Sequence, residues 1–141
     1  MNRIPSLLAT LALGGVSLLP AQSEEFQWRR ALASGKTIDI VGINGSIEAA
    51  GTSGADVLVS AVKTGRRSDP EEVRIEVVEH ADGVTICAVY PTSSRHGPNE
   101  CRAGGKGRNN TNNNDVRVRW TVRIPEGGRF TVRTVNGDVT G

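Results

Sequence analysis

The chain has few of the residues that usually build catalytic centres or stacking surfaces. Its 141 residues include two cysteines, two histidines and only 4% aromatic side chains. Few aromatic rings leave little surface for stacking against bases or sugars. The 17 basic and 15 acidic residues nearly balance, so the chain as a whole has no strong attraction to nucleic acid. We therefore expect no nucleic acid partner.

Long apolar runs are missing beyond the N-terminus. Residues 4–19 are nearly all apolar, they follow Arg3, and Pro20-Ala21 leads into a polar stretch. This layout is typical of a secretory signal peptide over residues 1–21, with cleavage after Ala21. The alternative is a retained membrane anchor, but a spanning helix needs about 20 apolar residues and this run is short. We expect export to the periplasm, cell surface or extracellular space, and one domain over residues 22–141.

The two cysteines, Cys87 and Cys101, form an isolated pair. In an exported protein such a pair favours one disulfide, which would stabilise the fold by about 3 kcal/mol for a loop of about 15 residues. The competing interpretations are two free thiols or a metal pair. Only His96 lies nearby as a further ligand, whereas a tetrahedral site needs four groups. The disulfide is the favoured prediction.

The most informative feature present is a strand–turn–strand pattern that occurs twice. Residues 38–47, the first Asn-Gly unit, read Ile-Asp-Ile-Val-Gly-Ile-Asn-Gly-Ser-Ile. Residues 130–139, the second Asn-Gly unit, read Phe-Thr-Val-Arg-Thr-Val-Asn-Gly-Asp-Val and align with the first without a gap. Asn-Gly favours tight turns, and β-branched neighbours favour strands. Repeated units of this kind bury their apolar faces against one another, so the pattern predicts stacked rungs.

The rest of the chain also reads as strands and turns. Residues 24–34 fit either a short helix or a first strand, and alternating apolar residues predict further strands over 56–63, 73–78, 84–90 and 116–124. Residues 92–114 have almost no apolar side chain and predict an exposed loop tied back only by Cys101. The predicted fold is all-β, with antiparallel hairpins leading into a β-solenoid-like stack. Because no cap follows the second unit, we expect the stack to be truncated at Gly141. The alternative is that the last strand is a short edge in a closed sandwich.

These residues together resemble a bacterial family, the DUF4097 β-strand-repeat proteins, which are described as adhesin-like. The resemblance depends on the two Asn-Gly turns, on residues 82–91, on the Cys101 loop with its Asn-rich tail, and on residues 115–125 followed by Gly127. It covers nearly all of residues 22–141. It implies an exported β-solenoid-like repeat protein that continues through further rungs. It carries over no catalytic residues.

The sequence offers three weak candidates for chemistry. Carboxylates at 71, 72, 76 and 79 could form the acid pair of a polysaccharide-cleaving enzyme, but a solvated sheet face with Glu–Arg pairs is the favoured interpretation. His80 and His96 have no nucleophile and acid in a recognised local pattern. Residues 109–115 lack the spacing of a calcium loop. We therefore predict no catalytic residue, no cofactor and no metal site.

The clearest strand, residues 116–124, alternates apolar residues with basic ones. This pattern buries Trp120 and exposes Arg117, Arg119 and Arg123, with Arg133 on the next strand. These four arginines are candidate contacts for a polyanion such as a phosphate-rich cell-wall polymer or lipopolysaccharide. The alternative is that they pair across the sheet with Glu72, Glu76 and Glu79, and the near balance of charge favours that pairing.

The expected function is non-enzymatic. The sequence indicates an exported envelope or surface protein with a scaffold or adhesin-like role, in contact with a cell-envelope polymer or protein through a sheet face or an open edge. The identity of that partner is unknown. The alternative is the N-terminal part of a carbohydrate-active β-helix enzyme whose catalytic rungs lie beyond Gly141.

Overall fold

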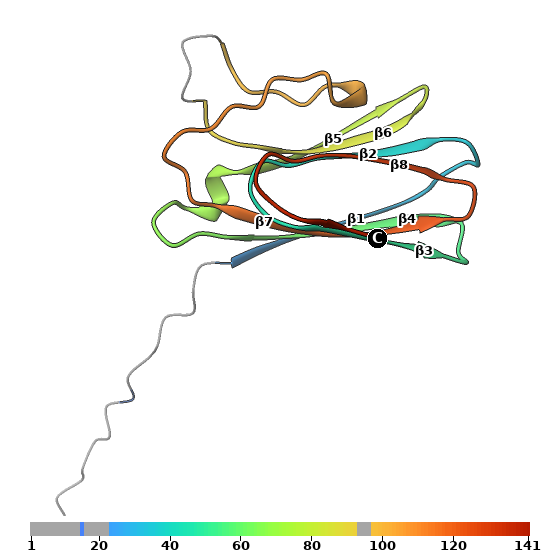
Figure 1. Ribbon diagram of the computed structural model, residues 1–141, viewed down its shortest axis with the longest axis horizontal. Helices are drawn as coiled ribbons and strands as arrows, with labels where there is room; N and C mark the ends of the chain where they lie inside the picture. Colours follow the sequence, from blue (N-terminus) through green and yellow to red (C-terminus); the bar gives the residue numbers. More distant parts are fainter. Residues whose placement is uncertain (1–14, 16–22, 93–96) are drawn as a thin grey trace, which may run out of the picture.

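The protein is built of two β-sheets that pack face to face (Figure 1). The computed structural model describes residues 15, 23–92 and 97–141, so the predicted signal peptide lies outside the described residues except for Gly15. The five-stranded sheet has the order β1 (Ser23–Ala31), β4 (Asp56–Thr64), β7 (Arg117–Pro125), β3 (Ile47–Thr52), β9 (Val139–Thr140). The four-stranded sheet has the order β5 (Arg74–His80), β6 (Gly83–Val89), β2 (Thr37–Val41), β8 (Arg129–Arg133). Short 3₁₀ turns occupy Pro70–Glu72 and Ala103–Gly105.

The core lies between the sheets and comes from strand alternation. Strand β7 buries every second residue, so Trp120 is 1% exposed, as the sequence predicts. Ile38 and Ile40 of β2 are fully buried and face the core from the other sheet. Strand β1 settles the ambiguity over residues 24–34, because it is a strand that places Phe26 and Trp28 against the core.

The two sheets mix antiparallel and parallel pairing. Strands β1, β4 and β7 pair antiparallel, and β5 with β6 form the predicted hairpin. Strand β2 instead lies parallel to both of its neighbours, and so does β3. The all-β prediction with antiparallel hairpins is confirmed, while neither sheet closes on itself among the described residues.

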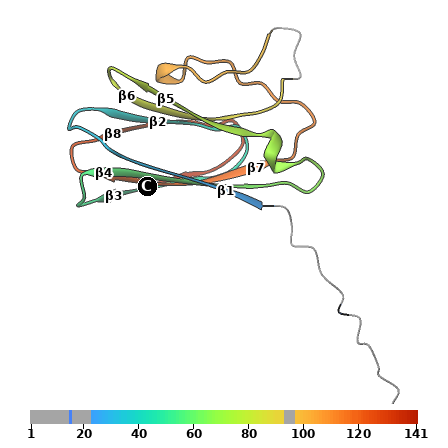
Figure 2. The ribbon, with the colours of Figure 1, turned by 180° about the vertical axis from the view of Figure 1, so that it is seen from behind.

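The parallel half consists of three strand pairs, and each pair crosses from the four-stranded sheet to the five-stranded one. The pairs are β6 with β7, β2 with β3, and β8 with β9 (Figure 2). Across them Ile40 lies between Ile86 and Val132. The two Asn-Gly units therefore stack in register, because Ile38 pairs with Phe130 and Ile47 pairs with Val139, the alignment read from the sequence.

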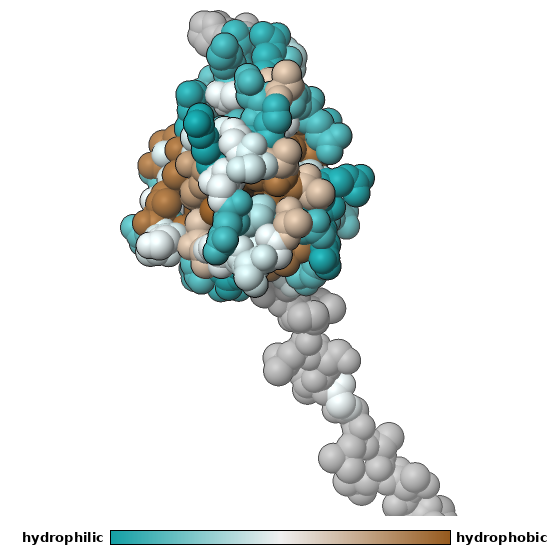
Figure 3. Space-filling view, turned by 90° about the vertical axis from the view of Figure 1, so that its right-hand side faces the viewer, coloured by the Kyte–Doolittle hydropathy of each residue, from teal (hydrophilic) through white to brown (hydrophobic). Residues whose placement is uncertain are grey.

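The segment between β6 and β7 corrects one expectation. It runs over the outer face of the four-stranded sheet and forms the mostly hydrophilic upper part of the molecule in Figure 3. Cys101 is not its only tie, because Asn99 is 5% exposed and its side-chain amide donates to the carbonyl oxygens of Tyr90 and Asn110. The Asn109 amide donates to the Ala88 carbonyl at 2.7 Å. In this loop, hydrogen bonds from side-chain amides take the place of buried apolar contacts. The amides donate to backbone carbonyls that would otherwise pair with a neighbouring strand.

Candidate functional site

The two Asn-Gly turns lie directly against each other. Each turn is an arch, since it carries the chain from one sheet to the other and does not return it within one sheet. The second arch donates the Asn136 N–H to the Ile43 carbonyl at 2.7 Å, and it accepts the Gly45 N–H at 2.9 Å. The Asn136 side-chain amide donates to Oδ1 of Asn44 at 3.1 Å, so the asparagines form a two-step ladder. The arches are thus paired through backbone and side chains.

The glycines explain why the sequence of each arch is so restricted. Gly45 has a φ of 121°, and a Cβ there would lie 2.0 Å from the Val118 carbonyl oxygen. A Cβ on Gly137 would lie 1.7 Å from the Gly45 carbonyl oxygen. Backbone therefore packs on backbone at both steps, and only glycine leaves the room that this requires.

The first arch has a neighbour on each side. Besides the second arch, it contacts the start of β7, where the Val118 N–H donates to the Asn44 carbonyl at 2.8 Å. The Trp120 N–H donates to the Ser46 carbonyl at 2.9 Å. The first Asn-Gly unit is consequently enclosed, and its apolar residues are at most 5% exposed at Ile38, Ile40, Ile43 and Ile47.

The second Asn-Gly unit has a neighbour on one side only within the described part of the chain. Strands β8 and β9 each end the order of their sheet, and the arch joins them into one continuous edge. Val135 is 73% exposed and Val139 is 45% exposed along this edge. An unpaired strand edge with apolar side chains is a template for adding another strand. We call residues 129–140 the open edge.

The four predicted arginine contacts do not form one group. Arg117, Arg119 and Arg123 point outward from β7 on the five-stranded sheet, and Arg123 is more buried than the other two. Arg133 lies on β8 of the four-stranded sheet, where its Nη1 donates to the Gly105 carbonyl at 3.0 Å. The structure therefore does not bring the four arginines together, because the turn after Pro125 carries the chain from β7 to β8 in the other layer.

The expected pairing of these arginines with glutamates is also wrong. Glu76 lies 3.1 Å from Arg74, within its own strand β5, and Glu79 lies 3.9 Å from Arg30. Strand β5 is in the four-stranded sheet, so its carboxylates are a layer away from β7. Among the described residues, the ion pairs within 4.0 Å include none of Arg117, Arg119 and Arg123.

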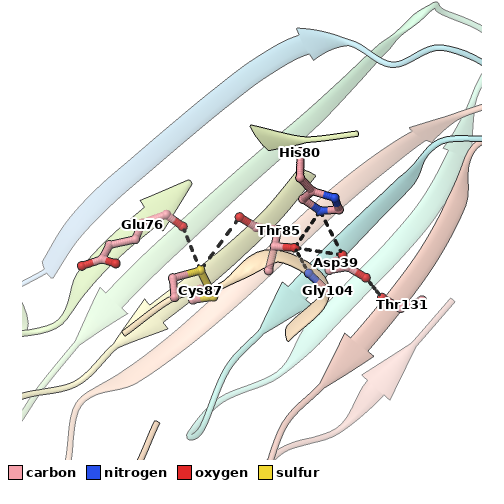
Figure 4. Close-up of polar contacts among 8 residues, drawn as sticks. Asp39, Glu76, His80, Thr85, Cys87, Gly104 and Thr131 are labelled. Carbon is pink, nitrogen blue, oxygen red and sulfur yellow. Dashed lines mark hydrogen bonds and ion pairs between the residues drawn. A yellow bond between two sulfur atoms is a disulfide. The ribbon is translucent and has the colours of Figure 1, made fainter. Parts of the chain in front are cut away.

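Sequence reasoning missed a polar cluster beneath the loop, on the outer face of the four-stranded sheet (Figure 4). Thr85 is fully buried and donates to Oδ2 of Asp39 at 2.9 Å, while the Gly104 N–H donates to Thr85 at 2.9 Å. His80 Nε2 lies 3.1 Å from the Thr85 oxygen, and Thr131 donates to Asp39 Oδ1. The sequence gives one sign of this cluster, a carboxylate at Asp39 between two isoleucines of a strand. That pattern does not identify the distant residues that Asp39 contacts.

This cluster resembles a catalytic triad in composition but not in geometry. In a triad one imidazole nitrogen faces the hydroxyl and the other faces the carboxylate. Here the same Nε2 faces both, at 3.1 Å from Thr85 and 3.7 Å from Asp39. The Thr85 hydroxyl is also enclosed and already donates to Asp39. The arrangement fastens the loop to the sheet and offers no exposed nucleophile.

The predicted cysteine pair is adjacent to this cluster. Cys87 of β6 and Cys101 of the loop form a disulfide, with their Cα atoms 5.7 Å apart. Disulfides persist in oxidising compartments, so this bond favours a location outside the cytoplasm. The described residues contain no cluster of three or more side chains that could hold a metal ion, and no helix among them is long and apolar enough to cross a membrane.

Comparison with known proteins found no matching family model, no matching curated protein and no matching solved structure.

Proposed function

We propose that this chain is an exported, non-enzymatic scaffold or adhesin-like envelope protein that recognises its partner through the open edge. The partner segment would be another strand–arch–strand unit of the Asn-Gly pattern, added in parallel to β8 and β9. Repeated addition of such units would give the β-solenoid-like stack that the sequence predicts. The resemblance to the DUF4097 β-strand-repeat proteins points in the same direction.

One observation carries the proposal: the first Asn-Gly unit already receives the second one in this way. Strand pairing, arch hydrogen bonds and the asparagine ladder all follow one register. The second unit has its apolar positions, its asparagine and its glycine at the same places as the first unit. It therefore offers the same pattern to a further unit. Main-chain hydrogen bonds along an added strand provide affinity, and side-chain fit provides specificity. A second candidate function, the β-helix enzyme, stays a prediction.

The test uses the purified, disulfide-bonded protein and a fluorescent peptide that copies residues 128–141. We expect saturable binding by fluorescence anisotropy. A peptide with alanine in place of Gly137 should bind about threefold to tenfold more weakly, because its Cβ would meet the backbone of the arch beneath it, as a Cβ on Gly137 meets the Gly45 carbonyl oxygen at 1.7 Å. General strand aggregation would tolerate that alanine. Equal binding of both peptides, or no binding of the first, would refute the proposal.

A protein variant locates the site. Val139→Lys places a charge on the open edge and should weaken peptide binding, because charged side chains block strand addition. Leu58→Lys is the matched control, since Leu58 is 37% exposed but lies on β4, inside the five-stranded sheet. Similar losses in both variants would place the peptide elsewhere.

A further inference from the structure

The outer face of β7 carries three basic side chains in line, Arg117, Arg119 and Arg123, which we call the arginine row. Their strand partners on β4 are uncharged, namely Thr64, Val62 and Leu58. On the other flank, Glu48 of β3 lies opposite Thr121, between Arg119 and Arg123. Alternate residues of a strand lie about 7 Å apart on one face, so the row extends over about 20 Å. Because none of the described carboxylates lies within 4.0 Å of it, its charge is available to a ligand.

At one end the row enters a groove beside the stacked arches. This groove has a volume of about 770 Å³ and is lined by Arg66, Arg67 and Arg117 together with the ladder asparagines Asn44 and Asn136. A smaller hollow of about 230 Å³ follows between Arg117 and Arg119, with Ser46 and Thr64 in its wall. Guanidinium groups beside amides and hydroxyls suit an anionic ligand that also carries hydroxyl groups.

The single carboxylate in the groove, Asp115, already has its partners. Its oxygens accept the backbone N–H groups of Arg67 and Ser68, each at 2.9 Å. These hydrogen bonds, that of Ser68 first, lower the pKa of Asp115 below its ordinary value. Its charge therefore holds the 65–69 loop in place, and the side chain of Arg67 remains 93% exposed with its Nε 3.9 Å from the carboxylate. Asp115 positions the loop that carries Arg66 and Arg67, and the three arginines of the groove outnumber this one carboxylate.

At the other end of the row, Arg123 lies in a hollow of about 370 Å³ lined by Trp28, Leu58 and Thr121. Its Nη1 is buried and has no hydrogen-bond partner among the residues that the structure describes. The neighbouring Arg29 differs, because it already forms an ion pair with Asp56 at 2.7 Å.

We propose that the arginine row and its terminal groove bind a linear anionic glycan, whose sulfate or carboxylate groups pair with the guanidinium groups. A linear ligand fits because the charges lie along one strand and continue into the groove. A sugar polymer fits better than nucleic acid because hydroxyl and amide side chains line the hollows together with the apolar Val62 and Leu58, and Trp28 is the one aromatic residue in their lining. Arg133 takes no part, since it faces away on the other layer.

The experiment measures binding of the disulfide-bonded protein to heparin oligosaccharides of increasing length, to polygalacturonate and to single-stranded DNA. Heparin carries sulfate and carboxylate groups, whereas polygalacturonate carries only carboxylates, so the two arms identify the anion. We expect affinity to rise with length until the oligosaccharide spans about 20 Å, the length of the row. Affinity should fall as salt increases, because binding a polyanion releases counterions.

The double variant Arg117→Gln/Arg119→Gln tests the site. It should weaken glycan binding by about tenfold or more, since each charge-assisted hydrogen bond contributes about 1.5–3 kcal/mol. The matched control is Arg74→Gln/Arg102→Gln, which removes equal charge from arginines paired with Glu76 and Glu100. The control should retain affinity within about threefold, and both variants should keep the thermal midpoint because surface substitutions change stability little.

Several outcomes would overturn the proposal. Equal losses in the two double variants would mean that only net charge matters. Single-stranded DNA that binds as tightly as the glycans would assign the row to nucleic acid. Failure of both glycans to bind would leave the row without this function. None of these outcomes affects the proposal for the open edge, because that proposal is tested by peptide binding. The peptide carries one carboxylate side chain, that of Asp138, so it is not an analogue of an anionic glycan.

Discussion

The first and second Asn-Gly units share one pattern but lie in different surroundings. Ile43 and Ile47 of the first unit are 5% and 1% exposed, whereas the corresponding Val135 and Val139 of the second are 73% and 45% exposed. The sequences predict equally apolar faces for both. The difference is that the first unit has neighbours on both sides and the second has one among the described residues. In a stacked architecture, burial therefore depends on position in the stack as much as on residue type.

The largest expected contrast is between Ile47→Ala and Val139→Ala, which change paired residues of adjacent strands. Ile47→Ala should lower the free energy of unfolding by about 2–5 kcal/mol, because it opens a cavity in the core beside Trp120. Val139→Ala should lower it by about 0.5 kcal/mol or less, as for an exposed side chain. Urea denaturation of the two variants measures both values. Equal losses would show that the second unit is buried in solution.

Alanine at the two arch glycines tests whether both steps of backbone stacking matter. Gly45→Ala should cost about 1–3 kcal/mol, because it places a side chain at a positive φ and against the Val118 carbonyl. Gly137→Ala meets the Gly45 carbonyl but should cost less, since an arch with one neighbour can shift outward. Gly54→Ala is the control, as its nearest atom would be 3.8 Å away. Thermal unfolding of the three variants ranks their losses of stability. A larger loss for Gly137→Ala than for Gly45→Ala would contradict the outward shift of the second arch.

The third strand pair, β6 with β7, differs from the two Asn-Gly units in its response to alkaline pH. No Asn-Gly arch joins β6 to β7, and the Tyr90 hydroxyl closes this pair by donating to the Val116 carbonyl at 2.7 Å. Burial raises the pKa of Tyr90 from 10.0 to about 12. Because the pKa of Tyr90 is higher in the folded state, the protonated Tyr90 hydroxyl stabilises the fold fully below pH 10. This stabilisation is lost as the pH rises towards 12.

The measurement is direct because the chain has one tyrosine. Ultraviolet absorbance of the phenolate should follow the same pH curve as the loss of β-structure by circular dichroism. Tyr90→Phe should remove the stability change in this pH range while keeping the ring in the core. Ionisation near pH 10 in the intact fold would contradict the buried hydrogen bond.

The parts of the fold that were predicted are those with a periodic signal. Alternation along β7 placed Trp120 in the core, and the gap-free alignment of the two units is the register in which they pair. Each of these features depends on spacing within a short stretch of chain. The isolated cysteine pair was sufficient for the disulfide, since no other partner existed.

The parts that were missed depend on polar contacts between distant residues. Asn99 and Asn109 fasten the loop through hydrogen bonds to β6 and its flanking residues, and Asp39 meets Thr85 across two strands. Lys63 is 5% exposed, yet it donates to the Val73 carbonyl at 2.8 Å and pairs with Glu24 at 2.6 Å. Composition treats such residues as solvent-exposed, because nothing local to the sequence identifies their partners.

The smallest expected effect is at the asparagine ladder, where the two units contact each other through side chains. The Asn136 amide donates to Oδ1 of Asn44 at an exposed position, so water can replace this hydrogen bond. Asn136→Ala should therefore cost about 1 kcal/mol or less, the usual net value for one hydrogen bond. Asn44→Ala removes the acceptor and should cost a similar amount, because the backbone contacts of both arches remain. In a double-mutant cycle the two losses should sum to more than the double variant shows, with a coupling of about 0.5 kcal/mol or more. Strict additivity would show that the ladder contributes nothing to stacking, and the backbone contact at Gly137 would then be what selects a partner for the open edge.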